Sequence, residues 1–71
     1  AAADPGHRYL YLDSLGWALY RNGQEKEALS TLQAALELTP AGETYLRAET
    51  HYHLGVIYRE RAEKEDALLH L

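Results

Sequence analysis

The sequence predicts an all-α fold of antiparallel helical hairpins, and three observations support this prediction. Apolar residues recur at intervals of three and four positions along most of the 71 residues, which is the period of one helix face. Glycine, asparagine and proline cluster between these stretches, where helices end. No stretch sustains an alternation of apolar and polar residues, so no sheet is expected.

The first predicted helix occupies the first third of the chain and ends at Asn22-Gly23, because both residues tolerate left-handed backbone angles. A helix that is apolar on two sides needs neighbours, or a ligand, on two sides. This helix carries two stripes, of which one consists of Tyr9, Leu12, Leu15, Gly16, Leu19 and Tyr20, and the other of Leu10, Asp13, Trp17 and Tyr20.

Three further helices are predicted. The second runs from about Glu25 to Leu38 and ends at Thr39-Pro40, since a residue before proline avoids helical angles. The third begins near Glu43 and the fourth near Glu63. Their expected inward faces are Ala28, Leu32, Ala35 and Leu36 in the second helix, Ala48, His51, Leu54, Gly55, Tyr58 and Ala62 in the third, and Ala67, Leu68 and Leu71 in the fourth.

The chain also repeats its own pattern. Gly16 and Gly55 each precede an alanine by 12 positions (Ala28 and Ala67), and each alanine precedes a leucine by four. The period between the two glycines is 39 (55 − 16). Small residues where two helices cross let the axes approach to about 8 Å. Each unit is therefore predicted to be a close-packed hairpin, which buries both of its flanks only when stacked on another.

These residues resemble the signature of the tetratricopeptide repeat family, with residues 9–42 as a full repeat, 43–71 as a truncated second one, and 1–8, including Asp4-Pro5, as the tail of a preceding repeat. The resemblance implies a fragment of a right-handed solenoid. The period of 39 exceeds the family's usual length of about 34. About five extra residues around positions 41–47 predict a longer first helix in the second repeat. The matching positions are Leu15-Gly16, Tyr20, Gly23, Ala28, Leu32, Ala35 and Pro40, whereas Ala62 replaces the turn glycine and Leu12 and His51 stand where the family often has tryptophan.

The missing glycine at position 62 leaves a structural alternative open. The third helix could run straight into the fourth, and the unpaired half-repeat would then exchange with a second chain. The repeat pattern favours the hairpin. The charged segment around Ala62 is expected to be a solvated helix end rather than a docking patch, because it contains three helix-supporting pairs, Arg59/Glu63, Glu60/Lys64 and Arg61/Glu65.

Composition excludes several classes of function. The net charge of −4 argues against binding of nucleic acid, and zero cysteine excludes disulfides and thiolate metal sites. No apolar run approaches the length of about 18 residues typical of a membrane span, and no signal peptide opens the chain, so a cytoplasmic location is expected. The absence of methionine indicates a piece of a longer protein.

No catalytic residue, metal or cofactor is expected. No spacing suggests a nucleophile with its base, and no glycine-rich loop follows a strand. His51 and His53 are two positions apart and point to different sides of a helix, while Glu49 and His53 supply two ligands where zinc needs three or four. His51 is expected in the repeat core and His53 on the surface, with His7 and His70 at solvated ends.

The resemblance implies that the first helix of each repeat lines a concave surface that binds a peptide or a partner helix. Trp17, Tyr20 and Tyr52 would be its aromatic anchors. Relatives that clamp the C-terminal carboxylate of heat-shock chaperones use Lys and Asn on this face, whereas here Asp13 and Trp17 stand at the corresponding positions, which argues against that activity. The positions carried over are Leu10, Asp13, Ser14, Trp17, Tyr20 and Arg21 in the first repeat and Glu49, Tyr52, His53, Val56, Arg59 and Glu60 in the second.

A structural role is the alternative. In that interpretation Trp17 and Tyr20 pack against a neighbouring repeat, and the chain associates with copies of itself or holds another domain in place.

Overall fold

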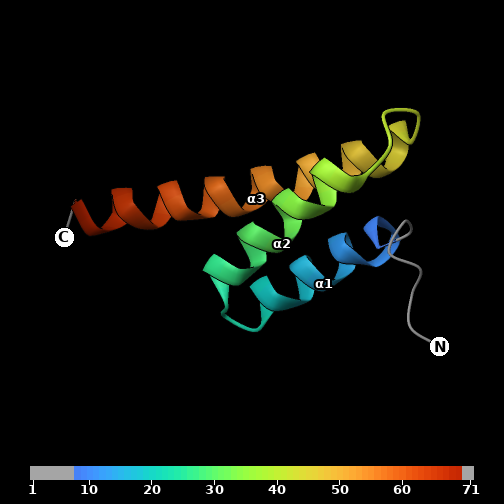
Figure 1. Cartoon of the computed structure of the whole chain (residues 1–71). Helices are drawn as coiled ribbons and strands as arrows, with labels where there is room; N and C mark the ends of the chain where they lie inside the picture. The colour runs from blue at the N-terminus through green and yellow to red at the C-terminus, as the bar shows by residue number, and fades with distance from the viewer. Residues whose placement is uncertain (1–7, 70–71) are drawn as a thin grey trace.

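A computed structural model describes residues 8–69, which form three helices, α1 (Tyr9–Arg21), α2 (Glu25–Leu38) and α3 (Thr44–Leu69). α1 and α2 form an antiparallel hairpin, and α3 packs across it and continues past its end (Figure 1). This part of the chain contains no strand, so the prediction of an all-α hairpin fold is confirmed. Four of the expectations stated above lie outside the described residues, namely those for Asp4-Pro5, His7, His70 and Leu71.

The turn between α1 and α2 has the predicted form. Gly23 adopts a φ of +85°, and its N–H donates to the carbonyl of Tyr20 at 3.0 Å. The N–H of Gln24 donates to the carbonyl of Leu19 at 2.9 Å. These bonds satisfy carbonyl groups that the end of α1 leaves free, and the left-handed residue reverses the chain.

The end of α2 is held by both neighbouring segments. Thr39 leaves the helix with an extended ψ of 123°, as expected before proline. The guanidinium of Arg47, from α3, donates to the carbonyls of Leu36 and Thr39, both at 3.2 Å. A cation at the C-terminus of a helix binds unpaired carbonyls and complements the helix dipole, so Arg47 fixes how α3 leaves α2.

The core lies where the three helices meet. Gly16 faces Leu32 so closely that a Cβ added at Gly16 would lie 2.6 Å from Leu32 Cγ. The predicted close crossing of the first two helices is therefore present. The buried apolar residues are Leu12, Ala28, Leu32, Ala35, Leu54 and Ile57.

The prediction of a separate fourth helix beginning near Glu63 is wrong. α3 continues without a break through Ala62 to Leu69, as the alternative interpretation allowed (Figure 1). Ala62 stands 39 positions after Gly23, and alanine is the best helix former, whereas a left-handed conformation would cost it about 1–2 kcal/mol. α3 begins 11 residues before Gly55, whereas α1 begins seven before Gly16, so the extra length of the repeat lies in the first turns of α3.

The predicted inward face of α3 is also wrong, except for Leu54. The buried residues of α3 are Thr50, Leu54 and Ile57. α3 carries two faces that could pack, and α2 covers the one with the branched side chains Leu54 and Ile57. The hydroxyl of Thr50 donates to the carbonyl of Leu46 at 3.1 Å, which satisfies its burial. The remaining predicted residues, Ala48, His51, Gly55, Tyr58 and Ala62, are exposed.

Candidate functional site

The residues proposed for the binding face lie on α1 and α3, and three side-chain contacts join these two helices. Each contact links residues about 40 positions apart in the sequence. On α1 the linking residues are Asp13, Trp17 and Tyr20, and on α3 they are His53 and Glu60. The fold thus assembles five of the twelve predicted residues into one seam between the helices.

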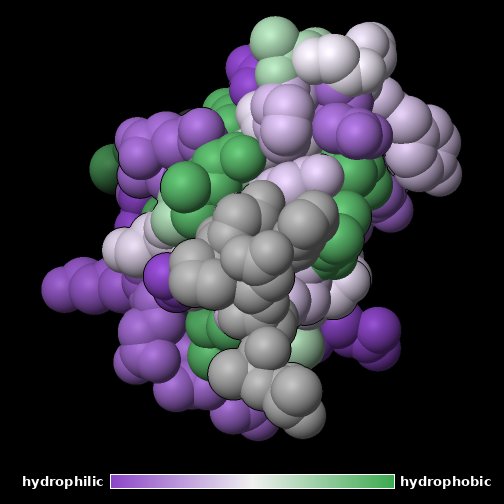
Figure 2. Space-filling model, turned by 45° about the vertical axis from the view of Figure 1, so that its right-hand side comes forward, coloured by the Kyte–Doolittle hydropathy of each residue, from purple (hydrophilic) through white to green (hydrophobic). Residues whose placement is uncertain are grey.

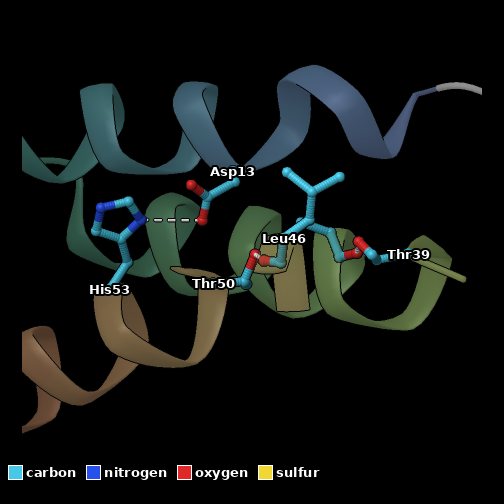
Figure 3. A network of polar contacts seen from close by, with 6 residues as sticks. Asp13, Thr39, Leu46, Thr50 and His53 are labelled. Atoms are coloured by element: carbon cyan, nitrogen blue, oxygen red, sulfur yellow. Dashed lines mark hydrogen bonds and ion pairs between the residues drawn. The ribbon is translucent and has the colours of Figure 1, made fainter. Parts of the chain in front are cut away.

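The pair of Asp13 and His53 is at the centre of this seam. Asp13 Oδ1 lies 3.0 Å from His53 Nδ1, and the two side chains are only 17% and 14% exposed. Figure 3 shows the imidazole reaching from α3 toward the carboxylate on α1. Because the carboxylate only accepts, the imidazole Nδ1–H donates. The prediction that His53 is a surface imidazole is therefore wrong, since α3 turns this side chain toward α1.

Trp17 packs on the same imidazole. The rings of Trp17 and His53 are stacked, with centroids 4.4 Å apart and planes inclined by 19°. Tyr20 also stacks on Trp17, with ring centroids 5.5 Å apart. Trp17 and Tyr20 are both half-buried and pack against the core cluster. They pack against α3 of this chain rather than standing free as anchors.

Charged residues complete the contacts between the helices. The hydroxyl of Tyr20 donates to Glu60, and Arg61 pairs with Glu25 at the start of α2 at 2.9 Å. Glu60 therefore contacts α1, and Arg61 contacts α2, instead of their predicted partners Lys64 and Glu65. This corrects two of the three ion pairs predicted within the helix. The third pair, Arg59 with Glu63, is present at 4.0 Å and is largely exposed.

Seven predicted residues remain accessible beside the seam. Tyr52 is 67% exposed and Leu10 is 55% exposed. The ring of Tyr52 is tilted by 56° against His53, with centroids 5.8 Å apart, so the seam continues into an exposed aromatic surface. The other members are Ser14, Arg21, Glu49 and Arg59, which are exposed, and Val56, which is half-buried.

Tyr45 is a residue of this surface that the family resemblance does not indicate. It is 78% exposed and precedes Tyr52 by seven positions, which places both on the same side of α3. The spacing of positions 45, 49, 52 and 56 is the signal that could have identified it. Tyr45 and Tyr52 on α3 and Leu10 on α1 are the large exposed apolar side chains among these residues.

The surface is open. Residues 8–69 enclose no pocket, and they contain no group of three or more His, Asp or Glu side chains placed to hold a metal ion. No helix in this range has the length and apolar character needed to cross a bilayer. On the side drawn in Figure 2, hydrophobic side chains form separate patches between hydrophilic ones.

His51 is exposed, so the prediction that it packs in the core is wrong.

A comparison with models of known protein families finds a match that covers the α1–α2 hairpin and the start of the loop that follows it. The family described as Tetratricopeptide repeat matches residues 9–41, which span α1, α2 and the first residues of the loop before α3. No curated protein and no solved structure matches the chain. Residues 9–41 thus match the tetratricopeptide repeat family as one repeat.

Proposed function

We propose that this segment binds a peptide or a partner helix on the surface that α1 and α3 form together. Tetratricopeptide repeats are, as a class, modules of protein–protein interaction that typically lack catalytic activity. The observation that carries the proposal is the exposed aromatic surface beside the Asp13–His53 seam. It combines Tyr52 and Tyr45 from α3 with Leu10 from α1.

Two physical properties support binding at this surface. Tyrosine offers a large apolar area with a polar tip and loses little conformational entropy on binding, so it is common among residues that dominate interface energy. The seam itself supports the surface, because the Asp13–His53 pair and the ring stack hold α1 and α3 in one orientation. A ligand then binds to a surface that is already ordered, which lowers the entropic cost of association.

The shape favours an extended or helical ligand over a small molecule. Small-molecule sites are concave and bury most of their ligand, whereas residues 8–69 enclose no pocket. Arg21 and Arg59 are exposed near one end of the surface and Glu49 near the other, so a peptide with complementary charges at its two ends would be oriented. The half-buried Trp17 and Tyr20 contribute by supporting the surface from below.

The test is a selection of peptides from a random display library on the immobilised 71-residue chain, followed by affinity measurements. Trp17 is the only tryptophan and stacks on His53, so its fluorescence reports binding at the seam. Tyr52→Ala is expected to weaken a selected peptide by about tenfold or more, the effect of losing one interface anchor of about 1.4 kcal/mol. Tyr58→Ala is the matched control, since Tyr58 is an exposed tyrosine on another side of α3.

Two results contradict the proposal. One is a library that yields no peptide competing at the seam. The other is a set of selected peptides whose affinity falls with Tyr58→Ala but stays unchanged with Tyr52→Ala and Leu10→Ala.

A second function, self-association, is favoured by a separate observation. Because α3 does not fold back at Ala62, its face with Gly55 and Tyr58 is left without the helix that would otherwise cover it.

A further inference from the structure

α3 has a second accessible face that the binding surface does not use. Its members follow helical spacing at positions 55, 58, 62 and 69, and they are Gly55, Tyr58, Ala62 and Leu69. Tyr58 is 44% exposed and Leu69 is 82% exposed, although the hydroxyl of Tyr58 accepts a bond from Gln33 at 3.3 Å. We call this stripe the Ala62 face. Exposed leucines at the end of a helix that projects from the body are an unsatisfied apolar surface.

The two glycines at equivalent repeat positions differ in what covers them. A Cβ at Gly16 would collide with Leu32 of α2, which fills the space that the missing side chain leaves. We call such a space beside a glycine a notch. A Cβ at Gly55 would meet nothing within 4 Å, so its notch is empty. α3 cannot fill the notch itself, because Leu69 is 14 residues further along the same straight helix, a rise of about 21 Å.

The charges around Ala62 identify the partner. Arg59 and Arg61 precede Ala62, and Glu63, Glu65 and Asp66 follow it. Glu60 and Lys64 break this order, but they lie four positions apart on the side of α3 that contacts Tyr20 of α1. A helix with this order of charges is complementary to a second copy of itself running in the opposite direction. A parallel copy would instead place like charges side by side.

We propose that two copies of this chain pair their α3 helices antiparallel about Ala62. Gly55 and Leu69 each lie seven residues from Ala62, so Leu69 of each copy enters the Gly55 notch of the other. Ala62 meets Ala62 of the second copy at the two-fold axis, where small side chains allow close approach. Arg59 and Asp66 are also seven residues apart, hence on one flank of the helix, and the pairing brings Arg59 of each copy opposite Asp66 of the other.

This interface shares only Arg59 with the proposed peptide surface. Apart from the bond between Gln33 and Tyr58 at its edge, the Ala62 face lies away from α1 and α2, which cover Thr50, Leu54 and Ile57 on another side of α3. Tyr52 and Val56 lie outside it, so a dimer leaves the surface beside the seam accessible. The two proposals can therefore fail separately.

Sedimentation equilibrium of the 71-residue chain, from micromolar to near-millimolar concentration, tests the pairing. The expected result is a reversible change from the 8.0 kDa monomer to a dimer. Leu69→Lys is expected to weaken the dimer by about tenfold or more, because it places a charge in the Gly55 notch. Leu68→Lys is the matched control, since Leu68 is the adjacent exposed leucine but lies on another side of the helix. A lysine near the end of a helix favours the helix in both variants.

An exchange of charges tests the antiparallel register. Arg59→Asp and Asp66→Arg, each alone, place like charges opposite each other twice per dimer and are expected to lower the association. An equimolar mixture of the two variants is expected to form a heterodimer of near wild-type stability, because each reversed charge again meets its opposite. The intrachain pair of Arg59 with Glu63 is largely exposed, so its loss has little effect on the fold. Far-UV circular dichroism of each variant checks that it remains helical.

The proposal is overturned by a monomer at every concentration, by a dimer that Leu69→Lys and Leu68→Lys weaken equally, or by variants that do not form the heterodimer on mixing. Tyr52→Ala must leave the association constant unchanged. If it lowers that constant, the copies meet through the surface beside the seam and the Ala62 face is not the interface.

Discussion

Gly16→Ala is expected to destabilise the protein although alanine is the better helix former. Gly16 lies in the middle of α1 and is buried against α2. The added methyl group would lie 2.6 Å from Leu32 Cγ, 2.8 Å from Leu32 Cδ2 and 3.3 Å from the backbone nitrogen of Leu32. Two of these distances are shorter than real carbon contacts, so α1 and α2 must separate or Leu32 must leave its position.

The magnitude follows from two opposing effects. Replacing glycine by alanine inside a helix stabilises it by about 1 kcal/mol. Overpacking a well-packed core costs about 1–3 kcal/mol. Leu32 has no exposed surface and is surrounded by Ala28, Leu54 and Ile57, so it has no free space to move into. The upper part of that range applies, and the net loss in the free energy of unfolding is about 1–2 kcal/mol.

Gly55→Ala is the matched control, because the same substitution is made at the equivalent position of the second repeat. Gly55 is inside α3, and its added Cβ would meet nothing within 4 Å. Only the helix effect remains, so the free energy of unfolding is expected to rise by up to about 1 kcal/mol. The two variants should therefore shift stability in opposite directions.

Urea unfolding followed by far-UV circular dichroism measures both changes. The protein should be at low micromolar concentration, so that only the monomer contributes. For a chain of 71 residues, 1 kcal/mol corresponds to a shift of about 4–8 °C in the melting temperature, which gives a second readout. Equal slopes of the urea dependence in all three proteins indicate that the unfolded states are comparable.

Stabilisation by Gly16→Ala comparable to that by Gly55→Ala would refute the reasoning. It would mean that the two helices of the hairpin can separate without loss, and hence that the contact of Gly16 with Leu32 does not define their packing. A loss of stability in both variants would refute the description of the Gly55 notch as empty.

Three further changes test other parts of the structure. Gly23→Ala is expected to lower the free energy of unfolding by about 1 kcal/mol, measured by urea unfolding, because φ at this turn is +85°; unchanged stability would contradict the left-handed turn. Asp13→Ala is expected to cost about 1 kcal/mol or more, and a double-mutant cycle with His53→Ala should give a coupling of at least about 0.5 kcal/mol, whereas additivity would disprove the contact. Ala62→Gly is expected to increase amide hydrogen exchange in the last two turns of α3, and unchanged protection there would show that Ala62 does not maintain the continuous helix.

The sequence alone determined where helices form and where two of them end. Asn22-Gly23 and Thr39-Pro40 act through local backbone preferences, which do not depend on the rest of the fold. The pairing of α1 with α2 was also predictable, because Gly16 and Ala28 are small residues at matching positions and the loop between the helices is short. The family resemblance in residues 9–41 rests on these same local features.

The end of the second repeat was predictable only as an alternative. Both the repeat pattern and the helix preference of Ala62 can be read from the sequence, and they conflict. The conflict is decided by what packs against residues 63–69, because a hairpin gains from burial that a straight helix does not. In this structure those residues are all exposed, and the local preference of alanine prevails.

Only the tertiary structure decided which side of α3 is buried and what the candidate site contains. Periodicity shows that a helix has an apolar side, but α3 has two, and contact with α2 selects the side of Leu54 and Ile57. The resulting orientation of α3 about its own axis directs His53 toward Asp13 and Trp17 and leaves His51 in solvent. Residues 40 positions apart become partners through this choice, since the sequence determines the order of side chains along each helix, whereas packing determines the angle at which the helices meet.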